Sequence, residues 1–224
     1  MSYKYQKALI LFSIFISANP AAIAASNTCH MLRSSQLLKK VRPQPSQVIV
    51  VKSLGGIKAK MILCQRHGTL WKAKFSSPFK AVIGKNGVAV SGEKKEGDLK
   101  TPVGLYPIGA AFGIHPLALQ MDYKYITKDD KFIDDIHHKA YNSWVSGSTD
   151  ATSYETMFTE PYTYGAIINY NMNPIIAGAG SAIFIHLWRS QNTPTSGCIA
   201  LDKKHLLMML HWLDKNQHPY VLVL

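Results

Sequence analysis

Short stretches rich in β-branched and aromatic residues alternate with turn residues along much of the chain. Stretches of this kind, bounded by Gly, Ser or Pro, predict β-strands. We expect strands at residues 47–52, 60–65, 69–75, 79–83, 165–170, 182–188 and 220–224. Gly55-Gly56 lies between the first two and indicates a hairpin turn. The chain is therefore predicted to be mainly β.

One segment near the C-terminus has the periodicity of a helix instead. Its apolar residues recur at the spacing i, i+3, i+4 and i+7, as Leu206, Met209, Leu210 and Leu213. This spacing places them on one face of a helix. Asp202 suits the N-cap, while Lys215 and Asn216 suit the C-terminal end. The sequence thus predicts one well-supported helix within a mainly β chain.

Two longer segments do not follow either pattern. Residues 84–104 are rich in glycine and charge but lack the G-x-x-x-x-G-K-[ST] spacing of a phosphate-binding loop, so we expect hairpin turns there. Residues 114–160 are polar and aromatic with few periodic stretches. A segment that long without clear elements is typical of a lid or a substrate-binding insertion.

The N-terminus has the order of a secretory signal peptide. Lys4 and Lys7 precede an uncharged run at residues 8–18, and an Ala-Ile-Ala sequence ends at Ala24. The run spans about 16 Å as a helix, roughly half of a ~30 Å hydrocarbon core, which disfavours the alternative of a membrane anchor. We expect cleavage after Ala24 and export to the periplasm or cell envelope, with no stable membrane insertion afterwards.

Composition and charge narrow the range of partners. Hydrophobic residues make up 47% of the chain, enough for a sizeable core. Lys and Arg total 25 against 13 Asp and Glu, a net charge of +12. Such a charge favours polyanions, acidic lipid headgroups or an anionic cell wall. Because we expect export, we predict no nucleic-acid partner, and we expect a monomer.

The three cysteines indicate a free thiol. An odd number leaves at least one unpaired, and an unpaired thiol in an oxidising compartment suggests a use for it. Cys29 and Cys64 are candidates for a disulfide between the N-terminal arm and the second strand, although both are alternatively free thiols. Cys198 then remains as the reactive candidate.

Cys198 has neighbours that suit thiol chemistry. His186 lies twelve residues earlier within a predicted strand, and a polar loop between them allows the two side chains to meet. A histidine within reach takes the thiol proton and later delivers it to a leaving amine. A thiolate–imidazolium pair would lower the pKa of the thiol. Ser196 and Gly197 are candidates for backbone support of an oxyanion.

These residues resemble a known family. The stretch Ile185-His186 … Thr193-Pro194-Thr195-Ser196-Gly197-Cys198-Ile199 is similar to the His … Ser-His-Gly-Cys signature of the L,D-transpeptidase catalytic domain. Further similarity lies in residues 81–87 (AVIGKNG) and 96–113 (EGDLKTPVGLYPIGAAFG), in Tyr141-Asn142 and in residues 180–184. The resemblance covers roughly residues 47–224 and implies a mixed β fold of sandwich or barrel type. The expected organisation is a signal peptide (1–24), an N-terminal arm (25–46) and a catalytic domain (47–224).

The resemblance implies an exported enzyme that acts on peptidoglycan stem peptides. Cys198 would form a thioester, with His186 as the base, and an amine acceptor would then give a 3→3 cross-link. With water as the acceptor the same site would be an L,D-carboxypeptidase. No metal or organic cofactor is expected.

The chain also departs from the family signature. It has Thr195 and Ser196 where the commonest signature has Ser and His, and Ala200 where that signature has Arg. Arg189 is a candidate to replace the missing arginine in substrate binding, unless it is only an exposed loop residue.

The insertion supplies further candidates for substrate contact. Tyr141, Trp144 and Tyr164 have aromatic faces that suit a sugar-peptide ligand, and they are alternatively core residues.

Two other functions compete with this interpretation. His115 and Asp122 stand seven apart, a spacing also found in zinc D,D-peptidases, and His137-His138 lie nearby. The flanking residues do not complete that motif, and we expect no metal. The other possibility is a non-enzymatic wall-binding module, in which His186 would be a core residue and Cys198 an inert thiol.

Overall fold

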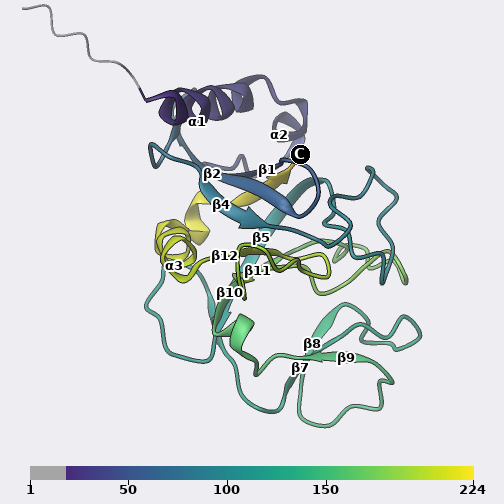
Figure 1. The fold of residues 1–224 in the computed structure, drawn as a ribbon. Helices are drawn as coiled ribbons and strands as arrows, with labels where there is room; N and C mark the ends of the chain where they lie inside the picture. Colours follow the sequence, from purple (N-terminus) through teal and green to yellow (C-terminus); the bar gives the residue numbers. More distant parts are fainter. Residues whose placement is uncertain (1–18) are drawn as a thin grey trace, which may run out of the picture.

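The computed structural model describes residues 19–224 and has a closed sheet at its centre (Figure 1). The strands follow one another in the order β1-β13-β5-β10-β11-β12-β4-β2, and β1 also pairs with β2, which closes the sheet into a barrel. β3 pairs with β2, and β6 pairs with β5, outside this ring. The strands are β1 (Gln47–Ser53), β2 (Lys58–His67), β3 (Leu70–Ala73), β4 (Phe79–Val82), β5 (Gly104–Gly113), β6 (Tyr123–Tyr125), β10 (Tyr164–Ile168), β11 (Phe184–Leu187), β12 (Ile199–Leu201) and β13 (Tyr220–Val223). The predicted mainly β, barrel-like fold is confirmed.

Alternation of side chains along the strands forms the main core. In β1, Ile49 and Val51 face this core, whereas Val48 and Val50 face a second core on the other side of the sheet. Ile49 and Val51 are buried in the main core, and Val48 and Val50 are buried against residues of the N-terminal segment such as Leu32 and Leu38. The Gly55-Gly56 turn joins β1 to the antiparallel β2 as predicted, and both glycines have positive φ values (93° and 53°).

The predicted helix is present as α3 (Lys203–Trp212), packed on β10 and β11. The Asp202 side chain caps it by accepting a hydrogen bond from the His205 N–H at 3.0 Å. The helix ends at Trp212, earlier than the prediction. Lys215 and Asn216 belong instead to a separate 3-10 turn, η3 (Lys215–Gln217), because Asp214 accepts a hydrogen bond from the Asn216 N–H and starts a new cap.

β5 was not predicted from the sequence, although it lies in the barrel wall between β13 and β10. Its sequence GLYPIGAAFG contains glycines and Pro107, which read as turn signals. The neighbouring chains nevertheless pair with it, since Asn169 donates its N–H to the Pro107 carbonyl and Ile108 donates to the Pro219 carbonyl, each at 2.9 Å. Tertiary pairing therefore overrides the local preference of this segment.

The insertion also contains regular structure that was not expected. Besides β6, it holds β7 (Asp130–Ile133), β8 (Ser143–Ser146) and β9 (Tyr154–Thr156), which form a separate sheet in the order β8-β7-β9 (Figure 1). The strands are too short for a clear period of two to appear in the sequence. A short 3-10 turn, η2 (Glu160–Tyr162), leads back to the barrel. An aromatic cluster joins this sheet to the barrel and consists of Phe112, Phe132, Tyr162 and Phe184.

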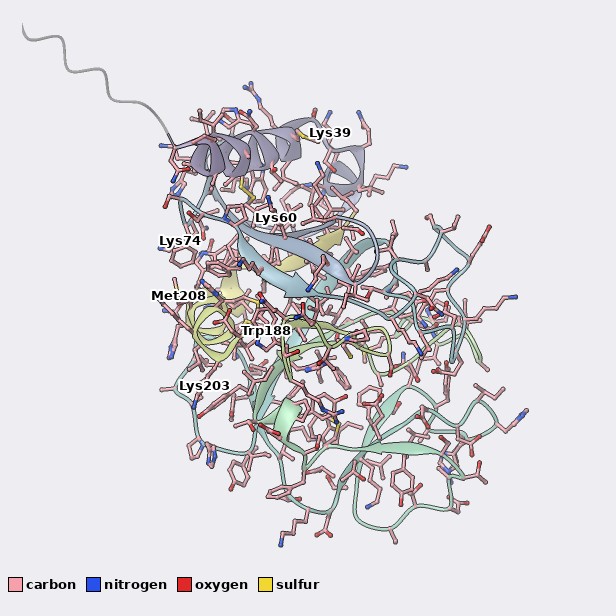
Figure 2. The ribbon with its side chains drawn as sticks, in the orientation of Figure 1. Lys39, Lys60, Lys74, Trp188, Lys203 and Met208 are labelled. Atoms are coloured by element: carbon pink, nitrogen blue, oxygen red, sulfur yellow. A yellow bond between two sulfur atoms is a disulfide. The ribbon has the colours of Figure 1, made fainter. Side chains whose placement is uncertain are left out.

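The predicted N-terminal arm is helical in the structure. It contains α1 (Pro20–Met31), η1 (Leu32–Ser34) and α2 (Gln36–Lys40). The expected disulfide is confirmed, since Cys29 and Cys64 are bonded and tie α1 to β2 (Figure 2). The helices of the arm were not predicted because α1 lacks a clear apolar face in its sequence.

The predicted signal peptide falls mostly outside the described residues, which begin at Asn19. The predicted cleavage bond after Ala24 lies inside α1, and Ala25 is buried against the barrel. Cleavage there stays a prediction that the structure does not address. In the described part of the chain no helix is both long and apolar enough to cross a membrane.

Three lysines lie side by side on the outer face of the barrel. Lys52 is paired in register with Lys60 across β1 and β2, and Lys60 with Lys80 across β2 and β4. All three are exposed, and Figure 2 labels Lys60 on β2 below α1. Like charges directly opposite one another weaken a sheet. This row is therefore a local electrostatic cost of the fold.

Candidate active site

Cys198 lies immediately before β12, where the chain returns beside β11. Because Ile199 pairs in register with Ile185, the thiol falls next to the start of β11. Its Sγ lies 3.2 Å from the Ala182 carbonyl, to which it donates, and it accepts a hydrogen bond from the Phe184 N–H at 3.3 Å. Ala182 has a positive φ of 52°, which aims its carbonyl at the sulfur. The thiol is thus held by two backbone groups, and the residue is only 6% exposed.

The backbone of Cys198 is fixed by two threonines. Its carbonyl accepts hydrogen bonds from the Thr195 hydroxyl at 2.6 Å and from the buried Thr101 hydroxyl at 3.4 Å. Thr101 in turn accepts from the Gly84 N–H at 2.9 Å. The 84–104 segment, which was expected to contain only hairpin turns, therefore contributes to the support of the nucleophile.

Gly197 fits a narrow space beside the thiol. A Cβ at this position would lie 3.1 Å from the Lys100 carbonyl oxygen and 3.2 Å from the Ile183 side chain, and its φ is +150°. Its N–H donates to the Thr195 hydroxyl at 3.2 Å, so it is already engaged. This engagement does not favour the Gly197 N–H as a donor to an oxyanion.

His186 belongs to β11 and is 8% exposed. Its Nδ1 lies 2.7 Å from the Leu187 carbonyl oxygen, which accepts only, so this nitrogen carries the proton. Nε2 is then the free, basic nitrogen. The ring meets the Tyr162 ring edge to face, with centroids 5.2 Å apart. Within the described residues His186 and Cys198 share no hydrogen bond, but both line one cavity of about 370 Å³.

Burial sets the charge of both groups. It lowers the pKa of His186 to about 4, helped by the nearby positive charge of Arg189. Burial also raises the pKa of the Cys198 thiol far above its usual range, and the negative charge of Glu155 adds to this effect. A neutral thiol therefore faces a neutral imidazole at neutral pH, and the thiolate–imidazolium pair considered from the sequence is not the resting state.

The cavity is lined by the active-site loop on one side and by the insertion on the other. Arg189 and Ser196 are among its lining residues, as expected from the sequence. The insertion was expected to contribute to substrate binding, and its residues Glu155, Thr156 and Thr159 line the cavity, followed by Pro161 and Tyr162 of η2. None of these five residues was singled out from the sequence, because no motif marks them.

The three aromatic candidates lie elsewhere and do not line this cavity. Tyr141 is buried and donates its hydroxyl proton to Glu96 at 2.6 Å, while accepting from the Gly180 N–H. The Trp144 indole donates to Asp130 at 2.8 Å. Tyr164 lies beside His115, with ring centroids 6.3 Å apart. Their contacts are those of structural residues, and the cavity lining directs the substrate-binding prediction to Tyr162 instead.

The histidines of the competing zinc hypothesis are used in other contacts. Asp122 pairs with Lys215 and His138 with Asp150, while the His115 carbonyl accepts from Tyr123. Between residues 19 and 224 no three His, Cys, Asp or Glu side chains gather into a group that could hold a metal ion.

Comparison with known proteins agrees with this geometry. A family model described as the YkuD L,D-transpeptidase catalytic domain matches residues 46–221, which include β1 to β12, α3 and both cavity residues Cys198 and His186. Neither the curated proteins nor the solved structures gave a match.

Proposed function

The chain belongs to the L,D-transpeptidase catalytic-domain family, which acts on peptidoglycan, and on this basis we propose that it is an exported cysteine L,D-transpeptidase. Cys198 is the nucleophile and His186 the base in this proposal. The observation that carries it is a free thiol, held by the Ala182 carbonyl, that lines one cavity with His186, whose Nδ1 lies against the Leu187 carbonyl.

The chemistry follows from the neutral pair. As Cys198 attacks the carbonyl carbon of the L-centre of the diamino acid at stem position three, its proton passes to Nε2 of His186. The developing oxyanion is stabilised by the Cys198 N–H. The imidazolium then returns the proton to the departing amine of the terminal D-residue, which leaves a thioester on Cys198. The Leu187 carbonyl holds the ring orientation throughout, since Nδ1–H stays bonded to it.

The acceptor decides the outcome of the second step. The amine of another stem peptide gives a 3→3 cross-link, whereas water gives an L,D-carboxypeptidase reaction with the same first step. Ala200 is buried in the cavity wall where the common family signature has an arginine, and Arg189 is the cationic side chain that lines the cavity instead. Arg189 is therefore our candidate for binding a substrate carboxylate.

Export is part of the proposal and rests on two observations. The N-terminal sequence has the order of a signal peptide, and the disulfide between Cys29 and Cys64 is typical of proteins that fold outside the cytosol. N-terminal sequencing of the mature protein from the cell envelope tests both the export and the cleavage position.

The activity is tested by incubating the protein with purified tetrapeptide muropeptides and analysing the products by mass spectrometry. We expect either 3→3 dimers or tripeptides, together with an acyl adduct on Cys198 in the intact protein. Cys198→Ala should abolish products and adduct while the near-UV circular dichroism spectrum stays native. Products formed at the native rate by Cys198→Ala would overturn the assignment of the nucleophile.

A further inference from the structure

The cavity contains two opposite charges that are not paired with each other. Glu155 in β9 approaches it from the insertion, and Arg189 approaches it from the loop after β11. Within residues 19–224 neither side chain forms a salt bridge. Figure 2 labels Trp188, which precedes Arg189 and also lines the cavity.

A charged Glu155 carboxylate in this position destabilises the folded protein. The Tyr162 hydroxyl donates a hydrogen bond to its carboxylate, but this donor is neutral. The nearby carboxylates of Asp134 and Glu96 repel it, and burial raises its pKa above the usual value. A half-buried carboxylate is stabilised by pairing with a positive charge. Among residues 19–224 Glu155 forms no salt bridge, so its carboxylate is free to bind a cationic group of a ligand.

Arg189 lines the same cavity as Glu155, Tyr162 and His186. Its charge lowers the pKa of both Tyr162 and His186. The side chain is exposed and carries no carboxylate partner. A planar guanidinium binds carboxylates through two parallel hydrogen bonds. The two charges thus line one cavity together with Tyr162 and the Cys198 thiol.

We propose that Glu155 and Arg189 together bind a zwitterionic amino-acid end of the substrate, an ammonium and a carboxylate carried on one carbon. Glu155 binds the ammonium and Arg189 the carboxylate. This inference rests on the proposed function, because in that reaction the side chain of the attacked diamino acid ends in such a group. It makes Glu155 a specificity residue for the acyl donor, which no sequence motif identifies.

The charge preference of the cavity is testable without any peptidoglycan substrate. Cys198 is the one thiol outside the disulfide, so thiol reagents report on this cavity alone. Two methanethiosulfonates of equal size, one bearing a trimethylammonium and one a sulfonate, each form a disulfide with the thiolate and release methanesulfinate. The measured quantity is the ratio of their rate constants at pH 8, by intact mass.

Glu155→Gln should lower the ratio of cationic to anionic reagent several-fold, and Arg189→Gln should raise it. Taking the ratio cancels any change in the pKa of the thiol itself. Glu160→Gln is the matched control, because this exposed carboxylate lies five residues away and does not line the cavity. An unchanged ratio in Glu155→Gln, in a protein with native circular dichroism, overturns the proposal.

A second measurement uses the acyl donor. The rate of thioester formation is compared for a tetrapeptide donor whose distal amine is free and for one whose distal amine is acetylated. In the native protein acetylation should slow acylation, and Glu155→Gln should remove most of that difference. If Glu155→Gln slows both donors equally, the ammonium assignment is wrong. If the reagent ratio changes as expected but no donor forms a thioester, the proposed function fails while the charge preference stands.

Discussion

The neutral state of His186 makes a prediction about stability that does not depend on substrate. The pKa of this group falls from 6.5 in the unfolded chain to about 4 in the folded protein because its ring is buried. Between these pH values the unfolded state binds a proton that the folded state does not. The free energy of unfolding must therefore fall as the pH falls from 6.5 to 4. The difference corresponds to about 3 kcal/mol.

The test compares the native protein with His186→Asn. Asparagine does not titrate, and its side-chain N–H stands near the position of Nδ1–H, so it can still donate to the Leu187 carbonyl. Urea unfolding, followed by tryptophan fluorescence at pH 7.5 and at pH 4, gives the free energy of unfolding for each protein. We expect the native protein to lose about 3 kcal/mol more than the variant between these two pH values.

The difference between the two proteins isolates His186, because all other titrating groups contribute equally to both. His211→Asn is the control for the substitution itself, since this side chain is exposed on α3 and does not line the cavity. Native and His186→Asn curves that run parallel between pH 7.5 and pH 4 would show that the imidazole is not kept neutral by burial. The neutral-pair mechanism would then lose its basis.

Three further predictions concern the support of the fold and the site. Replacing Cys29 and Cys64 together by Ala should lower the free energy of unfolding by about 4 kcal/mol, because the disulfide closes a loop with a sequence separation of 35. The Tm measured by calorimetry should then fall by about 10 °C. A Tm within about 2 °C of the native value would contradict this prediction. Lys60→Glu should raise the free energy of unfolding by about 0.5–1 kcal/mol, since it places a negative charge between Lys52 and Lys80. Lys72→Glu should not, because position 72 lies opposite the uncharged Gln65. Thr101→Val should lower kcat, and it should lower the free energy of unfolding by about 1–3 kcal/mol because it leaves the Gly84 N–H without an acceptor. Thr101→Ser should restore both kcat and the free energy of unfolding.

The strands that could be predicted are those whose own residues have a pattern typical of β-structure. β1, β2 and β13 each contain an uninterrupted run of apolar residues and are found within one or two residues of their predicted bounds. β5 was missed because its glycines and proline favour turns, and it is a strand only through its pairing with β13 and β10. Local preference and tertiary pairing disagree there, and the pairing decides.

The residues of the site can likewise be divided into those that the sequence predicts and those that it does not. Cys198 and His186 follow from residue types and spacing, and β11 and β12 place them on one cavity as expected. Glu155 and Tyr162 belong to an insertion whose strands have three or four residues, too few for a recognisable pattern. The charge state of Cys198 and His186 also could not be predicted from the sequence, because it depends on how deeply the two side chains are buried in the folded structure.

The buried, neutral thiol and the charge of Glu155 have a joint consequence if the enzyme is exported as proposed. The thiolate is the form that oxidises, so a thiol whose pKa is raised by burial and by a nearby carboxylate resists oxidation while the cavity is empty. An ammonium bound to Glu155 would neutralise that carboxylate and remove its share of the increase. The same contact that recognises the substrate would then make the proton easier to transfer to His186. Recognition and activation of the nucleophile would thus depend on one side chain, and a donor without the ammonium would lose both.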